Sequence, residues 1–182
     1  NANTGSAYIV FGMEDSFATS IDLGMLDGEN GLRLDGTAVG NLTGTSVGGG
    51  GDVNGDGFAD VVIGSAMAGS AGTAYVAFGA EDGFPAAFDL GTLDGSNGFV
   101  VNGIDVGDLA GTAVSGASDL NGDGFDDLLI GARQAAPNAN SNAGETYVLF
   151  GHSGTFSASI EAFELDGNGG LLLAGVDQDD QS

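Results

Sequence analysis

The sequence predicts an all-β fold built from repeated antiparallel units. Glycine supplies 36 of 182 residues, and each glycine inside a helix costs up to about 1 kcal/mol, so long helices are disfavoured. A short run of aromatic and β-branched residues, bounded by glycine, occurs three times and contains Tyr8, Tyr75 and Tyr147. Runs of this kind are typical of buried strands. We therefore expect all three tyrosines to lie in strands and to be buried.

The three runs belong to a longer internal repeat. Each ends in Phe-Gly, at Gly12, Gly79 and Gly151, with spacings of 67 and then 72 residues. A Leu-Asp-Gly turn recurs at the same spacings, and an acidic nine-residue segment occurs at 52–60 and 119–127. This order predicts four strands per unit, with the acidic segment joining the first two. Four-stranded antiparallel units in tandem predict β-propeller blades.

The spacing divides the chain into about two and a half blades. All of 1–182 is read as one propeller segment: a half blade at 5–36, a full blade at 37–103 and a full blade at 104–182. Because propellers close with about four to eight blades, this chain is an incomplete propeller on its own. The half blade contains only its two outer strands, so we expect an open strand edge through which copies can form an oligomer.

The two acidic segments are candidate calcium loops. Each has oxygen-bearing side chains at positions 1, 3, 5 and 9, which can converge on one hard cation, and a glycine at position 6 that permits a sharp turn. Ligation by oxygen alone from a flexible loop favours Ca²⁺ over Mg²⁺. We therefore predict two calcium sites. The expected ligands are Asp52, Asn54, Asp56, the Phe58 carbonyl and Asp60 in the first segment, and Asp119, Asn121, Asp123, the Phe125 carbonyl and Asp127 in the second.

Acidic segments of this kind also occur in EF-hands and in solvated turns. An EF-hand needs a Glu at position 12 and helices on both sides, but position 12 is Ile63 or Ile130 within a strand-like run. A solvated turn rich in Asp, Asn and Gly remains the alternative to a metal site. Asp126, which lies beside the ligand Asp127, is expected to face solvent.

Composition excludes several classes of function. The chain has two basic residues, 26 acidic residues and a net charge of −24, so nucleic-acid binding is not expected and divalent cations are natural partners. It has no cysteine and no apolar run long enough to enter a membrane. We predict no catalytic residues and no enzyme activity. The single histidine, His152, is expected to be a surface residue.

The chain resembles the FG-GAP repeats of the integrin α-subunit-type β-propeller and its bacterial relatives. The Phe-Gly pairs and both acidic segments match the family pattern, whereas the Gly-Ala-Pro element is reduced to Gly64-Ser65-Ala66 and Gly131-Ala132-Arg133. The resemblance implies calcium bound in the loop between the first two strands of a blade. It also implies an extracellular role in interaction or adhesion.

These observations lead to one functional hypothesis and two alternatives. The hypothesis is a non-catalytic, calcium-binding, extracellular or cell-surface β-propeller module for adhesion, protein–protein interaction or assembly, with a protein or further propeller blades as its partner. The first alternative is a self-assembling component of an extracellular sheath, fibre or surface layer. The second is an accessory domain of a secreted hydrolase.

Overall fold

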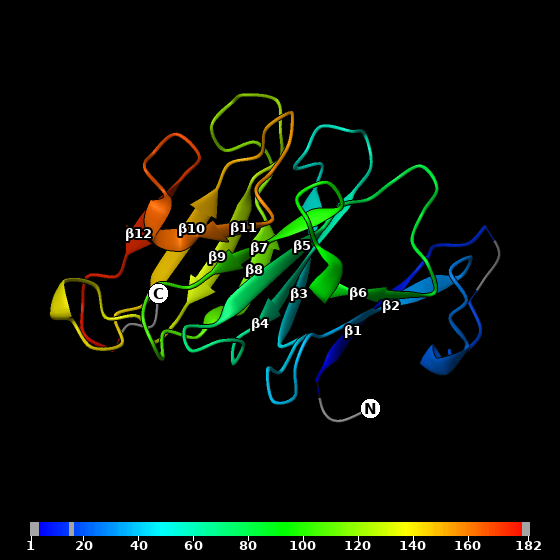
Figure 1. Cartoon of the computed structure of the whole chain (residues 1–182), viewed down its shortest axis with the longest axis horizontal. Helices are drawn as coiled ribbons and strands as arrows, with labels where there is room; N and C mark the ends of the chain where they lie inside the picture. Colours follow the sequence, from blue (N-terminus) through cyan, green and yellow to red (C-terminus); the bar gives the residue numbers. More distant parts are fainter. Residues whose placement is uncertain (1–3, 15–16, 180–182) are drawn as a thin grey trace.

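The computed structural model describes residues 4–14 and 17–179, and in these ranges the chain forms twelve short strands in three sheets that stand side by side (Figure 1). The helical segments of the described part are three-residue 3₁₀ turns, at Leu23–Met25, Leu90–Thr92, Pro137–Ala139 and Ala162–Glu164. None of the described helices could span a membrane.

Each sheet is built on one unit of the sequence repeat, and the first two sheets also include one short strand from the unit that follows. The first sheet contains β1 (Ser6–Val10), β2 (Gly31–Asp35) and β6 (Ala87–Asp89). The middle sheet contains β3 (Ser46–Gly51), β4 (Asp60–Ser65), β5 (Thr73–Ala77), β7 (Gly98–Asn102) and β11 (Ser159–Glu161). The last sheet contains β8 (Ala110–Gly116), β9 (Leu128–Ala132), β10 (Glu145–Leu149) and β12 (Gly170–Ala174).

The pairing within the units is antiparallel, as expected for blades. In the middle sheet the order β3, β4, β5, β7 follows the chain, and the last sheet repeats it as β8, β9, β10, β12. The first sheet has only the outer antiparallel pair of β1 and β2. The predicted fold class, all-β with about two and a half four-stranded blades, is confirmed.

Two short strands were not predicted from the sequence. β6 follows β5 along the chain but pairs in parallel with β2 of the first sheet, and β11 follows β10 but pairs in parallel with β7 of the middle sheet. Each is three residues long, so no alternating pattern of apolar residues could develop. These strands bind each unit to the outer edge of the unit before it.

Two apolar clusters fill the spaces between the sheets. One joins Leu32 and Leu34 of the first sheet to Ile63 and Tyr75 of the middle sheet. The other joins the middle and last sheets, where Phe156 stacks on Phe99 with ring centroids 4.7 Å apart. The core therefore lies between sheets, and each sheet buries a face only where a neighbour covers it.

Close backbone contact between the middle and last sheets depends on glycine. A side chain at Gly64 in β4 would overlap the carbonyl oxygen of Gly111 in β8. A side chain at Gly116 would likewise meet the Gly49 carbonyl oxygen. Any larger residue at these positions would push the two sheets apart, so glycine allows the inner strands to pack by backbone.

The three equivalent tyrosines differ in burial. Tyr75 is 4% exposed and Tyr147 is fully buried, as predicted, but Tyr8 is 44% exposed. Tyr75 faces the first sheet and Tyr147 faces the middle sheet. Within the described residues no sheet lies against the same face of β1. The prediction of a buried Tyr8 was therefore wrong because burial of this position requires a preceding sheet.

The two buried tyrosines offer a test of this packing. The Tyr75 hydroxyl is 3.1 Å from Thr37 Oγ1 and hydrogen-bonds to it. The buried Tyr147 hydroxyl is close to the backbone of Ile104, the residue equivalent to Thr37, but not in hydrogen-bonding geometry.

We expect Tyr75→Phe to lower the free energy of unfolding by up to about 1 kcal/mol, because it removes the hydrogen bond to Thr37, whose hydroxyl still accepts one from Asn41 Nδ2. Tyr147→Phe should leave the free energy of unfolding unchanged or raise it by about 1 kcal/mol, because it removes a buried polar atom. Urea unfolding of both variants measures the difference. Equal losses in the two variants would contradict this description of the interfaces.

Candidate metal-binding loops

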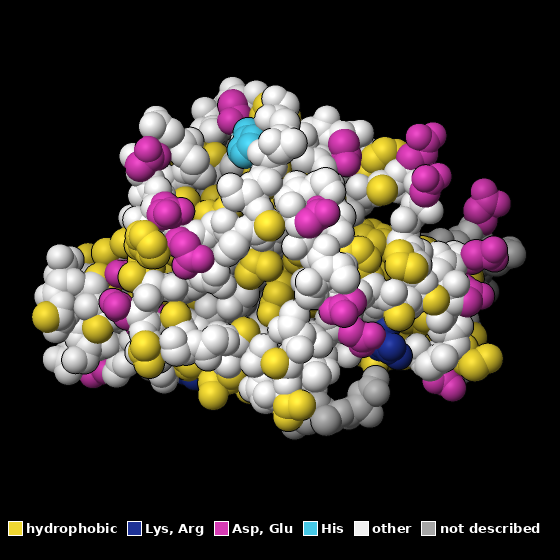
Figure 2. Space-filling view, in the orientation of Figure 1, with side chains coloured by type: hydrophobic (Ala, Val, Ile, Leu, Met, Phe, Trp, Pro, Cys, Tyr) yellow, Lys and Arg dark blue, Asp and Glu magenta, His cyan; other side chains and the backbone are white. Residues whose placement is uncertain are grey.

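The two acidic segments are the hairpin loops that join the first two strands of each full unit. The first acidic loop (52–60) joins β3 to β4, and the second acidic loop (119–127) joins β8 to β9. Both loops lie at the same end of the sheets, at the top of Figure 1. Acidic side chains are spread over the face seen in Figure 2, where basic ones are few.

Oxygens from positions 1 and 3 meet within each loop. The Asp56 N–H donates to Asp52 Oδ1 at 3.0 Å and to Asn54 Oδ1 at 2.9 Å, which places these two oxygens beside the same hydrogen. At position 5, Asp56 Oδ1 accepts from the Phe58 N–H at 2.8 Å. The second loop repeats this arrangement at Asp119, Asn121, Asp123 and Phe125.

The glycines of each loop permit this tight arrangement. Gly55 and Gly57 have φ angles of 73° and 90°, in the left-handed region that disfavours other residues. The ring of Phe125 covers Gly55, so the two loops touch. The Phe58 side chain is exposed.

Asp60, at position 9 of the first loop, has a structural role that the sequence did not reveal. Its side chain is buried and accepts hydrogen bonds from the Val53 N–H at 2.8 Å and the Gly79 N–H at 2.9 Å. Gly79 belongs to the Phe-Gly pair, so this carboxylate ties the acidic loop to the Phe-Gly turn of the same unit. The second loop has the same contacts, from Leu120 N to Asp127 Oδ2 at 2.7 Å and from Gly151 N to Asp127 Oδ1 at 2.9 Å.

Burial makes the first loop electrostatically unfavourable without a counter-charge. The pKa of Asp60 is raised to about 6: desolvation by burial raises it most, two backbone hydrogen bonds lower it, and the nearby carboxylates of Asp56 and Asp52 raise it. In the second loop, hydrogen bonds from backbone amides, chiefly that of Gly124, lower the pKa of Asp119. Backbone amides therefore stabilise the ionised form of Asp119, whereas at Asp60 the cost of desolvation outweighs them.

The two loops are connected across the sheet interface. Asp126 Oδ2 accepts a hydrogen bond from the Asp52 N–H at 2.9 Å, and the His152 N–H donates to the Val53 carbonyl at 3.0 Å. Asp126 is half-buried, so the expectation that it faces solvent was wrong. Its partner is the backbone of the neighbouring loop, and a contact between two units has no signature in the repeat of one unit.

The donor set fits a hard cation in its chemistry. Among residues 4–14 and 17–179, no three Asp, Glu, His or Cys side chains come together in a group that could hold a metal. The predicted set, however, also uses an amide and a backbone carbonyl in each loop. A carboxylate oxygen has two lone pairs, so one that accepts a hydrogen bond can still coordinate a cation. The ten ligands therefore remain a prediction.

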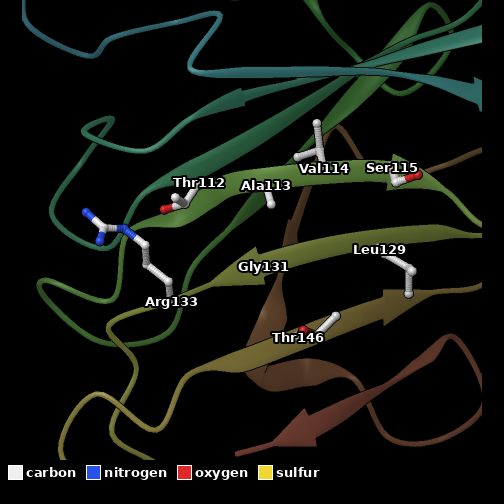
Figure 3. A pocket seen from close by; sticks show the side chains of 8 residues that line it. All are labelled: Thr112, Ala113, Val114, Ser115, Leu129, Gly131, Arg133 and Thr146. Carbon is white, nitrogen blue, oxygen red and sulfur yellow. The ribbon is translucent and has the colours of Figure 1, made fainter. Parts of the chain in front are cut away.

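A hollow on the outer face of the last sheet offers fewer charged or metal-ligating side chains than the acidic loops. It has a volume of about 430 Å³ and is lined by side chains of β8, β9 and β10 with Arg133 at its rim (Figure 3). The equivalents of Leu129 and Thr146 in the middle sheet, Val62 and Ala74, are buried under the last sheet. We therefore interpret the hollow as an uncovered packing face.

His152, the single histidine, lies beside the Phe-Gly pair of the last unit. The imidazole is exposed and stacks on Phe156 with centroids 4.0 Å apart, and its Nδ1 lies 3.0 Å from the Ser153 carbonyl. These contacts are consistent with the predicted surface position.

Removing the position-9 carboxylate should destabilise the fold even without metal. In excess chelator, we expect Asp127→Ala to lower the free energy of unfolding by about 2–3 kcal/mol, because it leaves two backbone N–H groups without their acceptor. Asp123→Ala is the matched control, since it removes the same charge from an exposed position of the same loop. Chemical unfolding measures both. If the two variants lose the same stability, Asp127 has no structural role of its own.

Comparison with protein-family models matches the FG-GAP repeat at residues 43–77 and 110–149. The first range begins three residues before β3 and ends with β5, the second runs from β8 to the end of β10, and each contains one acidic loop. No curated protein matches the chain. The predicted FG-GAP resemblance is thus confirmed for these two segments: the chain contains two FG-GAP repeats, one in each of its two full units.

Proposed function

We propose that this chain is a non-catalytic, calcium-binding module of the β-propeller type that acts outside the cell in adhesion, protein–protein interaction or assembly. The observation that carries the proposal is the gathering of side-chain oxygens from positions 1 and 3, repeated in two loops of FG-GAP units. The same gathering of oxygens in both loops supports one kind of ligand for both.

Charge supports a divalent cation as that ligand. Asp52, Asp56 and Asp60 carry three carboxylates in nine residues, and burial together with its neighbours disfavours the ionised form of Asp60. A cation in the loop would offset this repulsion, which is the chemistry that calcium would supply. The residues that would hold it are those predicted from the sequence, with Asp60 and Asp127 also keeping the Phe-Gly turns in place.

A structural role for calcium follows from where the loops lie. Each loop contacts the Phe-Gly turn of its own unit through Asp60 or Asp127, and the first loop also contacts the last unit's turn through Val53. A cation that binds only the folded loop stabilises the protein by mass action, by about 2.7 kcal/mol at a concentration 100 times the dissociation constant. Calcium would therefore stabilise both units and their junction.

The extracellular setting is supported by the calcium chemistry. Calcium modules outside cells bind with dissociation constants of about 10⁻⁴–10⁻³ M. A weak site of this kind would be filled only where calcium is abundant. Assembly is favoured as a second candidate function by the exposed apolar residues at the two ends of the chain.

Calcium titration tests the proposal directly. We expect isothermal titration calorimetry to show two sites with dissociation constants of about 10⁻⁴–10⁻³ M, and calcium to raise the unfolding temperature. Asp56→Ala should remove one site, and Asp56→Ala combined with Asp123→Ala should remove both.

Asp94→Ala is the charge-matched control, because Asp94 is an exposed acid in a Leu-Asp-Gly turn outside both loops. It should bind calcium as the unmodified chain does. A folded protein that binds no calcium at about 5 mM, well above the expected dissociation constants, would overturn the calcium proposal. Equal losses in the control and the loop variants would show that the effect comes from net charge alone.

A further inference from the structure

The segment that follows each Phe-Gly pair forms a repeated joint between units. We name residues 84–90 and 156–162 the docking segments of the middle and last units. The first contains β6 and lies on β2, and the second contains β11 and lies on β7. Both docking segments thus lie, in parallel, along the outer strand of the preceding sheet.

The two joints have the same register and the same contacts. Phe88 is paired with Leu34 in the first joint, and Ile160 with Val101 in the second. Each joint begins with a backbone hydrogen bond of 3.0 Å, from Arg33 N to the Ala86 carbonyl or from Val100 N to the Ala158 carbonyl. Leu90 and Ala162, which end the docking segments, are buried.

The first unit contains the same segment, but it has no sheet to lie on within the described residues. The repeat aligns Phe17, Ile21 and Leu23 with Phe84, Phe88 and Leu90. Phe17, Ile21 and Leu23 are all exposed, and Ile21 has 42% of its surface accessible. Three large apolar side chains at the positions that dock in the other two units therefore face solvent.

The last unit presents the complementary surface. β12 is the outer strand of its sheet, equivalent to β2 and β7, and among the described strands it pairs only with β10. Leu173, the equivalent of Val101, is 53% exposed, whereas Val101 is 1% exposed under β11. The neighbouring Leu172 is also exposed. Within the described residues, the docking segment of the first unit and the outer strand of the last unit are thus both uncovered.

We propose that residues 17–23 of one copy dock in parallel on β12 of a second copy and repeat the internal joint between units. The register of the two internal joints places Ile21 opposite Leu173 and Ser20 opposite Leu172. Tyr8 then lies toward the last sheet of the second copy, as Tyr75 lies toward the first sheet. The partner is a second copy because the chain already contains two joints of this kind, and the two uncovered surfaces match the two halves of such a joint.

This joint is head-to-tail, so its two surfaces differ and each copy keeps one free end. Such an interface produces a closed ring or an open filament. The joint uses the outer strand and therefore does not require the inner strands that the half blade lacks. It does not depend on calcium, although each copy carries a charge of −24 and screening by salt at about 0.15 M lowers the repulsion.

Sedimentation velocity of the full chain tests the proposal in salt of about 0.15 M, where the Debye length is about 8 Å. It should be measured over a wide range of protein concentrations, with calcium and with chelator. We expect concentration-dependent growth beyond the dimer. Ile21→Asp and Leu173→Asp change exposed residues at opposite ends of the chain, and each should give a monomer. Val106→Asp, which adds the same charge at an exposed turn outside both surfaces, should assemble as the unmodified chain does.

Mixing the two end variants is the sharpest test. The Ile21→Asp chain keeps an intact β12, and the Leu173→Asp chain keeps an intact docking segment, so an equimolar mixture should form dimers and stop there. Thermal unfolding of each variant alone checks that it is folded. An unmodified chain that stays monomeric at every concentration would overturn the proposal, and the surface would then serve a different partner. Assembly that survives both substitutions, or folded end variants that do not pair, would also overturn it. Calcium titration of the same samples separates this result from the calcium proposal.

Discussion

Direct backbone contact between neighbouring sheets is the constraint on which the structure depends. The inner strands β4 and β8 approach so closely that Gly64 and Gly111 leave no room for a side chain between them. This contact sets the distance at which Tyr147, Phe99 and Phe156 fill the space between the same two sheets. Glycine thus does more than disfavour long helices: at these positions it lets neighbouring sheets approach closely.

The repeated motifs act together because one buried carboxylate connects them. Asp60 accepts hydrogen bonds from its own loop and from Gly79 of the Phe-Gly pair, and Asp127 does the same in the last unit. The acidic loop and the Phe-Gly turn are about twenty residues apart in the sequence but form one structural unit. Calcium bound in the loop would therefore act on the turn through the same side chain.

The sequence predicted what repeats within a unit. The four-stranded blades, the hairpin position of both loops and the family follow from motifs that recur in fixed order. It missed what happens between units: the parallel strands β6 and β11, the contact of Asp126 with the neighbouring loop, and the exposure of Tyr8. Contacts between units depend on which sheets are neighbours in space, and local residue patterns do not record this.

The most direct test of this constraint compares alanine substitutions at two glycines of the middle sheet, Gly64 in β4 and Gly49 in β3. Gly64→Ala places a methyl group against the Gly111 carbonyl, whereas Gly49→Ala in β3 meets nothing within 4 Å. Unfolding in urea should show a loss of about 1–3 kcal/mol or more for Gly64→Ala, the usual cost of overpacking. It should show little change for Gly49→Ala. Equal stability of the two variants would contradict the claim that close backbone contact holds the sheets together.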